Sequence, residues 1–158
     1  MADRDVIDAL IATYRELNLT LRPKLAQREV WGDPIREPES LAGILYRLRN
    51  RELNASQAIK EMIRTGETAL SDDEQEAMVA LHETALGLAP NVLLSQFGTA
   101  REATLAMVRD LPDEVWQQEF NTPRGRMTLR RYLETLVERD RVVLQAIQSK
   151  IGSQAPAS

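Results

Sequence analysis

The sequence predicts an all-α fold, a four-helix bundle, on three observations. Apolar residues recur at three- and four-residue steps in four separate segments, as they do along the buried face of an amphipathic helix. The composition is rich in the helix formers Leu, Ala, Glu, Arg and Gln, and only 4% of residues are aromatic. A length of 158 residues suits one domain with a single core. We expect that domain over residues 1–151, with the small, polar stretch 152–158 forming a disordered C-terminal tail.

The first two helices are expected on either side of Trp31–Pro34, where Gly and Pro interrupt the pattern. The first helix has an apolar stripe made of Ile7, Leu10, Ile11, Tyr14, Leu21 and Leu25. Pro38 suits the first turn of the second helix, which ends at Thr65-Gly66. The stripe of this second helix is Leu41, Ile44, Leu45, Leu48, Ala55, Ile59, Met62 and Ile63.

A long connection with a short extra helix is expected between the second and third long helices. The short helix begins at Ser71, because Ser71 and Glu74 have capping-box spacing, and it ends near Leu86. The third long helix begins near Pro90. Its stripe contains Leu94, Phe97, Thr104, Leu105 and Val108.

The last long helix is expected to begin after Thr128, a suitable N-cap residue. The preceding residues, Leu111 to Gly125, are interpreted as a loop with room for a single helical turn near Trp116 and a tight turn at Pro123–Gly125. The stripe of the last helix is Leu129, Leu133, Leu136, Val143, Leu144 and Ile147.

Composition argues against several functional classes. The net charge is -4, and no cluster of Lys and Arg stands apart from neighbouring acids, so no nucleic-acid partner is expected. The chain has no cysteine and therefore no disulfide or thiolate nucleophile. No apolar run approaches the roughly 18 residues of a membrane span, so no membrane partner is expected. The charged segment MADRDVIDAL lacks the apolar core of a signal peptide, and we expect a cytoplasmic protein.

Each helical stripe is interrupted by one polar residue near the middle of its helix. These residues are Asn18, Glu52, Arg101 and Asp140. If the helices pack antiparallel, the four side chains approach one another at mid-height. Because an unpaired charge is costly to bury, Arg101 is expected to face Glu52, Asp140 or both. Three interpretations remain open: a splayed bundle that leaves these groups in solvent, a buried structural salt bridge, and a functional site.

Several segments carry a resemblance to a known family. They are Trp31, ESLAGILYRLRNRE (39–52), LLSQFGTAREATLAMVRDLPDEVW (93–116) and GRMTLRRYLETLVERDRVVLQAI (125–147). In order and spacing they resemble the DinB-like superfamily of bacterial four-helix proteins, over nearly the whole chain. The resemblance implies an up-down bundle with a long connection after the second helix, assembled as a homodimer. Family members with known activities are mostly metal-dependent, with three histidine ligands, and several act with low-molecular-weight thiols as transferases or isomerases.

The metal ligands implied by the resemblance are substituted in this chain. The family's His-Asp-x-x-His pattern on the last helix corresponds to Arg139, Asp140 and Val143, and the third histidine corresponds to Arg47. A protonated guanidinium has no lone pair to donate and valine has no donor atom, so neither metal nor cofactor is expected. One interpretation is that the arginines take the electrostatic role of the metal by pairing with Glu52 and Asp140. The alternative for Arg47 is a solvated edge.

Two further features have ordinary interpretations. His82 is the only histidine, and one histidine beside a glutamate does not form a transition-metal site, so a helix surface or a dimer contact is expected. A local basic patch precedes and begins the last helix, where it could bind an anion, but a solvated face is favoured. The patch consists of Arg124, Arg126, Arg130 and Arg131.

Three functional hypotheses follow, in this order. The first is a metal-free DinB-like protein that acts as a small-molecule-binding or stress-associated homodimer. The second is an enzyme, a transferase or hydrolase, that uses Glu52, Arg101 and Asp140 without metal. Its signature would be a cavity beside the cluster and a carboxylate with a perturbed pKa. The third is a relocated divalent metal site, in which His82 would join the carboxylates. The sequence names no substrate or ligand.

Overall fold

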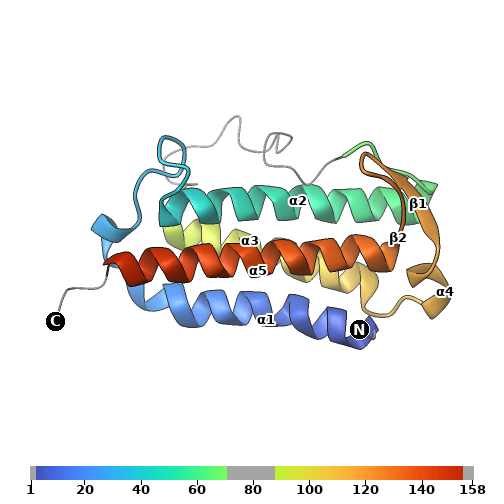
Figure 1. Cartoon of the computed structure of the whole chain (residues 1–158), viewed down its shortest axis with the longest axis horizontal. Coiled ribbons are helices and arrows are strands. Elements are labelled where there is room, and N and C mark those ends of the chain that lie inside the picture. Colours follow the sequence, from blue (N-terminus) through green and yellow to red (C-terminus); the bar gives the residue numbers. More distant parts are fainter. Residues whose placement is uncertain (1–2, 71–87, 155–158) are drawn as a thin grey trace.

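A computed structural model of the chain describes residues 3–70 and 88–154. The fold is mostly helical, with a small two-stranded sheet at one end (Figure 1). The four long helices are α1 (Asp3–Leu21), α2 (Leu41–Thr65), α3 (Pro90–Val108) and α5 (Leu129–Gln154). The shorter elements are the 3-10 helices η1 (Arg22–Lys24) and η2 (Arg28–Val30), the single turn α4 (Asp113–Trp116), and the strands β1 (Glu119–Thr122) and β2 (Gly125–Thr128).

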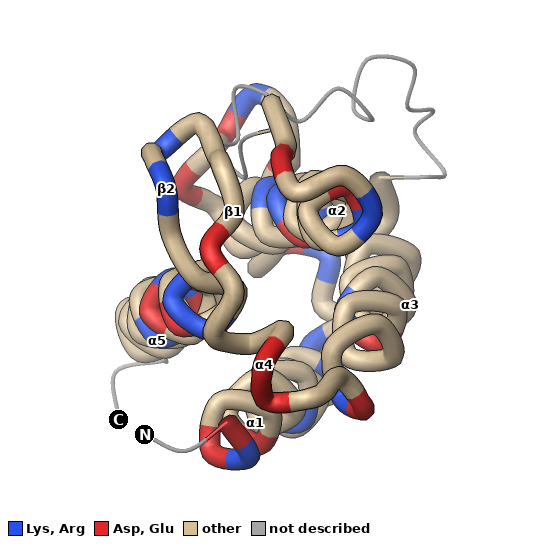
Figure 2. The backbone as a smooth tube through the Cα atoms, turned by 90° about the vertical axis from the view of Figure 1, so that its right-hand side faces the viewer, with Lys and Arg blue, Asp and Glu red and all other residues tan. Residues whose placement is uncertain are grey.

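The four long helices surround a common axis, in the order α1, α3, α2, α5 when viewed end-on (Figure 2). Their directions do not alternate along the chain as an up-down arrangement requires. Arg49 and Glu52 on α2 contact Gln96 and Arg101 on α3 respectively, so α2 and α3 are parallel. The long connection between Thr65 and Pro90 allows this, because it is long enough to return the chain along the whole of α2. Helices α1 and α5 are also parallel to each other (Figure 1).

Most helix ends coincide with the signals in the sequence. Gly66, with φ 85°, ends α2 as predicted, in a left-handed conformation that favours glycine. The Thr128 hydroxyl accepts a hydrogen bond from the Arg131 N–H at 3.0 Å, which confirms it as the cap of α5. Pro38, in contrast, lies before α2 and not in its first turn. The helix begins at Leu41, with Ser40 as its N-cap.

The segment after α4 forms a β-hairpin, where the sequence indicated only loop and turn. Phe120 of β1 pairs with Met127 of β2, and the tight turn at Pro123–Gly125 joins the strands as expected. The chain just after α2 joins the other edge of β1, since the Thr68 N–H donates to the Asn121 carbonyl at 2.9 Å. The single turn expected near Trp116 is confirmed as α4.

The last helix is longer than expected. It continues through Gly152 and ends at Gln154, so residues 152–154 are helical and do not begin a disordered tail. Glycine is tolerated there because it is exposed on the last turn. The short helix expected from Ser71 to Leu86, together with His82, lies outside the described residues.

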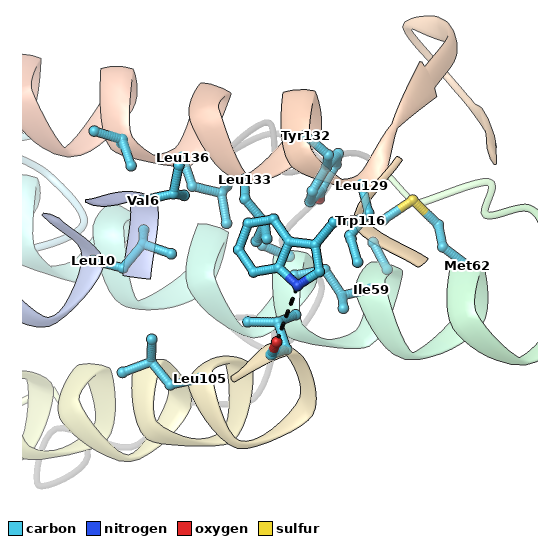
Figure 3. Packing of buried hydrophobic residues seen from close by; sticks show 14 of the residues in the cluster. Val6, Leu10, Ile59, Met62, Leu105, Trp116, Leu129, Tyr132, Leu133 and Leu136 are labelled. Atoms are coloured by element: carbon cyan, nitrogen blue, oxygen red, sulfur yellow. Dashed lines mark hydrogen bonds between the residues drawn. The ribbon is translucent and has the colours of Figure 1, made fainter. Parts of the chain in front are cut away.

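The buried apolar side chains form two clusters, one towards each end of the long helices. The cluster near the hairpin surrounds Trp116, whose indole N–H donates to the Val108 carbonyl at 3.3 Å (Figure 3). The other cluster surrounds Trp31 and Phe97. Between them, every long helix contributes a polar side chain. Burial of the two clusters on the shared faces of the helices holds this polar layer in place.

No helix within residues 3–70 and 88–154 has the length and apolar character needed to cross a membrane.

Candidate functional site: a buried charge network

Two carboxylates and two guanidinium groups form a charge network between the apolar clusters. Glu52 on α2, Arg101 on α3, and Arg139 and Asp140 on α5 are 0%, 1%, 6% and 2% exposed. Each comes from the middle of its helix, with buried apolar residues of one cluster before it and of the other after it. The interpretation in which these groups reach solvent is therefore wrong. The formal charges of the four residues cancel.

Arg101 is the centre of the network and uses all of its hydrogen-bond donors. Its Nε and Nη2 donate to the two oxygens of Glu52, each at 3.0 Å. Nη1 and Nη2 donate to the two oxygens of Asp140 at 2.8 and 3.1 Å. The second proton of Nη1 goes to the Leu10 carbonyl on α1 at 2.7 Å. A guanidinium has five N–H groups, and these five bonds account for all of them.

Two threonine hydroxyls and Arg139 donate the remaining hydrogen bonds to the two carboxylates. The Thr13 hydroxyl on α1 donates to Asp140 Oδ2 at 2.6 Å, and the Thr104 hydroxyl on α3 donates to Glu52 Oε2 at 2.8 Å. Arg139 Nη2 donates to Glu52 Oε1 at 2.6 Å and to Asp140 Oδ1 at 3.0 Å. Each of the four carboxylate oxygens therefore accepts two hydrogen bonds, which fills its lone-pair sites.

The network fixes the ionisation of three of its members, Glu52, Arg101 and Arg139. Burial by itself raises the pKa of Glu52, but attraction to Arg101 and Arg139, with their hydrogen bonds, outweighs it. The pKa therefore lies well below the ordinary value of 4.5. Burial also opposes the charge of Arg101, yet Glu52 and Asp140 raise its pKa further above its usual range. The pKa of Arg139 is raised for the same reason, against burial and repulsion from Arg101. Glu52, Arg101 and Arg139 therefore stay charged at neutral pH.

The structure brings together three of the four residues singled out from the stripes. Glu52, Arg101 and Asp140 meet as expected, and Arg101 contacts both carboxylates. Asn18 does not join them: its amide donates to the Tyr14 carbonyl at 3.0 Å and accepts from Arg22 at 2.6 Å. Thr13 takes the expected place of Asn18, because the buried face of α1 is centred on Leu10, Thr13 and Leu17.

The three positions that the resemblance leads us to expect at metal-ligand sites have separate environments. Arg139 joins the network and pairs with Glu52, as the electrostatic interpretation requires. Arg47 is half-buried and donates to the carbonyls of Gly43 and Pro34, in its own helix and in the loop before it, at 3.2 and 3.4 Å. Val143 packs against the apolar cluster around Trp31 and Phe97. Guanidinium groups and an apolar side chain have no lone pair to offer, so these positions do not fit a metal ion. Within the described ranges, no three His, Cys, Asp or Glu residues are grouped so as to hold one.

Besides Thr13, sequence reasoning missed two features of the interior. Thr104 was recognised only as part of an apolar stripe, although its hydroxyl donates a hydrogen bond to Glu52. Arg49 is 1% exposed, donates to Asn50 and Gln96, and stacks 5.3 Å from the Tyr46 ring. It lines a groove of about 500 Å³ between α2 and α3, whose lining does not include the network residues. No pattern in the sequence separates Arg49 from an exposed helical arginine.

Three of the four arginines of the basic patch near the start of α5 form exposed or half-buried ion pairs. Arg126 pairs with Glu119 at 2.7 Å, Arg130 with Asp3 at 2.8 Å, and Arg131 with Glu138 at 2.9 Å. This agrees with the solvated face favoured from the sequence.

Comparison with known proteins adds no relative: no family model, no curated protein and no solved structure matches this chain.

Proposed function

We propose that this chain is a metal-free member of the DinB-like superfamily, a cytoplasmic four-helix-bundle homodimer that acts by binding a small molecule or as a stress-associated protein. The observation that carries the proposal is the pairing of Arg139, at a family ligand position, with Glu52 and Asp140. With Arg101, this arginine puts two fixed positive charges against two carboxylates. A dication bound by neutral histidines would supply the same charge, so the guanidinium groups can replace it electrostatically.

Two observations weigh against the alternative of a carboxylate enzyme. General acid–base catalysis is most efficient when the pKa lies near the working pH, whereas the pKa of Glu52 lies far below it. The oxygens of Glu52 and Asp140 are also fully occupied by the arginines and threonines. Neither carboxylate has a lone pair left for a substrate proton. The binding role therefore ranks above the enzyme, and the relocated metal site remains last.

The proposal is tested by elemental analysis of untagged protein from cells grown with zinc, nickel and manganese. We expect far less than one metal per chain. The double substitution Arg139→His and Val143→His, which restores the family pattern on α5, is the matched gain-of-ligand control. About one metal per wild-type chain, lost on changing Asp140 or His82, would contradict the proposal, because three or more converging ligands would have to exist.

The homodimer is tested separately by light scattering at micromolar concentration. A mass of twice 17.9 kDa is expected. A single-chain mass would remove dimerisation from the proposal and leave the metal-free site untouched.

A further inference from the structure

Arg139 has donors that the protein does not use. Its Nη2 makes both hydrogen bonds to the network, but Nε and Nη1 are buried and have no hydrogen-bond partner within the described residues. By the donor count of a guanidinium, one N–H on Nε and two on Nη1 are left over. Buried donors without a partner are rare in native proteins, because each forfeits its hydration.

No rearrangement within the network supplies acceptors for these donors. All four oxygens of Glu52 and Asp140 already accept two hydrogen bonds each. Turning Arg139 so that Nε or Nη1 reached a carboxylate would displace Arg101, Thr13 or Thr104 and leave another donor unpaired. No acceptor for these donors remains among residues 3–70 and 88–154, so the missing acceptor lies outside the described part of the protein.

The charge balance defines the chemical class of that acceptor. Glu52 and Asp140 already neutralise Arg101 and Arg139, so an anion would leave one uncompensated negative charge in the interior. Such a charge is far more costly to bury than a neutral polar group. A neutral oxygen satisfies the donors without that cost.

The unpaired donors of Arg139 belong to the contact between α2 and α5. These two helices contact each other less extensively than α2 and α3 do, and Arg139 bridges them.

We propose that Arg139 forms a binding site between α2 and α5 for a neutral oxygen acceptor. Two sources share this chemistry: water held in the interior, and the carbonyl oxygen of a small uncharged molecule. The site, with water as its occupant, does not depend on the proposed function. Only the carbonyl source rests on the binding role proposed above. In contrast to the family's metal, the occupant here accepts hydrogen bonds from the protein.

The test observes the Nε–Hε group of Arg139 by NMR of the nitrogen-15-labelled full chain. Its resonance is assigned by its loss in Arg139→Lys, which keeps the positive charge beside Glu52 and Asp140. Arg126→Lys is the matched control, since Arg126 is an exposed arginine paired with Glu119. Samples are measured in buffer, then titrated with acetamide as a neutral carbonyl probe and with acetate as an anionic one.

A cross-peak between Arg139 Hε and water, absent for Arg126, supports the site with water as the occupant. A saturable shift of the Arg139 resonance with acetamide supports it with a carbonyl. A saturable shift with acetate alone overturns the neutral class. Absence of both a water cross-peak and any probe response overturns the site. The metal content of the protein is independent of all four outcomes, so failure here is distinguishable from failure of the proposed function.

Discussion

Replacing Arg101 by alanine should be among the most destabilising single changes in this protein. The substitution removes all five hydrogen bonds of the guanidinium and its position 5.0 Å from the Phe97 ring centroid. Glu52 and Asp140 then share only Arg139, and one negative charge is left uncompensated in the interior. Removal of one partner from a buried pair costs about 3–5 kcal/mol. We expect a loss of unfolding free energy in that range.

The assay is urea denaturation followed by circular dichroism, because urea, unlike guanidinium chloride, does not screen charges. Arg109→Ala is the matched control, since Arg109 is 46% exposed and pairs with Glu102 at 3.3 Å. A surface pair of this kind contributes less than about 1 kcal/mol. If Arg101→Ala cost no more than the control, Arg101 could not lie in a buried charge network.

Three further predictions concern pH and packing. Because the pKa of Glu52 is lowered on folding, its contribution to stability is present above the unfolded value of 4.5 and is lost as the pH falls towards the folded value. The unfolding free energy should decrease below about pH 4.5, and urea titrations at several pH values should show a shallower decrease in Glu52→Gln. Gly43→Ala would place a Cβ 2.3 Å from the Glu37 carbonyl oxygen, so a loss of about 1–3 kcal/mol of unfolding free energy is expected in urea. Gly152→Ala is the control, because its Cβ would meet nothing within 4 Å and should cause no loss in the same assay. Trp116→Ala should cost about 3–5 kcal/mol in thermal or urea unfolding, because the indole fills the cluster near the hairpin, and a loss below about 1 kcal/mol would contradict that packing.

The sequence predicted the helices well because their signals are local. Apolar periodicity, the glycine after Thr65 and the N-cap at Thr128 depend only on residues within one turn. The hairpin had no comparable signal. Its strands have four residues each, and Phe120 is the only buried side chain among them. What positions β1 is its pairing with the chain near Thr68, a long-range contact that no local pattern contains.

The polar layer was predicted in part, for an equally physical reason. Charged residues on an apolar face are conspicuous, so Glu52, Arg101 and Asp140 could be identified from the stripes. Threonine is common on exposed faces too, so nothing marked Thr13 as buried until Asp140 supplied an acceptor at 2.6 Å. The stripe assigned to α1 was also displaced around the helix, which placed Asn18 where Leu17 lies.

The helix directions depend on the connection and not on the helices. Each amphipathic stripe is compatible with a parallel or an antiparallel neighbour, so the stripes alone could not exclude the up-down order. The parallel arrangement of α2 and α3 brings Glu52 level with Arg101 and Thr104. The same polar residues that interrupt the stripes thus align the helices, since any axial shift would leave buried charges unpaired.

A double-mutant cycle measures the pairing of Arg139 with Glu52, the contact on which the proposed function depends. Glu52→Gln, Arg139→Met and the double variant are unfolded in urea beside the wild type, and their free energies are compared. Direct contact at 2.6 Å between buried charges predicts a coupling energy of about 1–3 kcal/mol. Additive losses, within about 0.3 kcal/mol, would mean that the two side chains do not interact and would contradict the account.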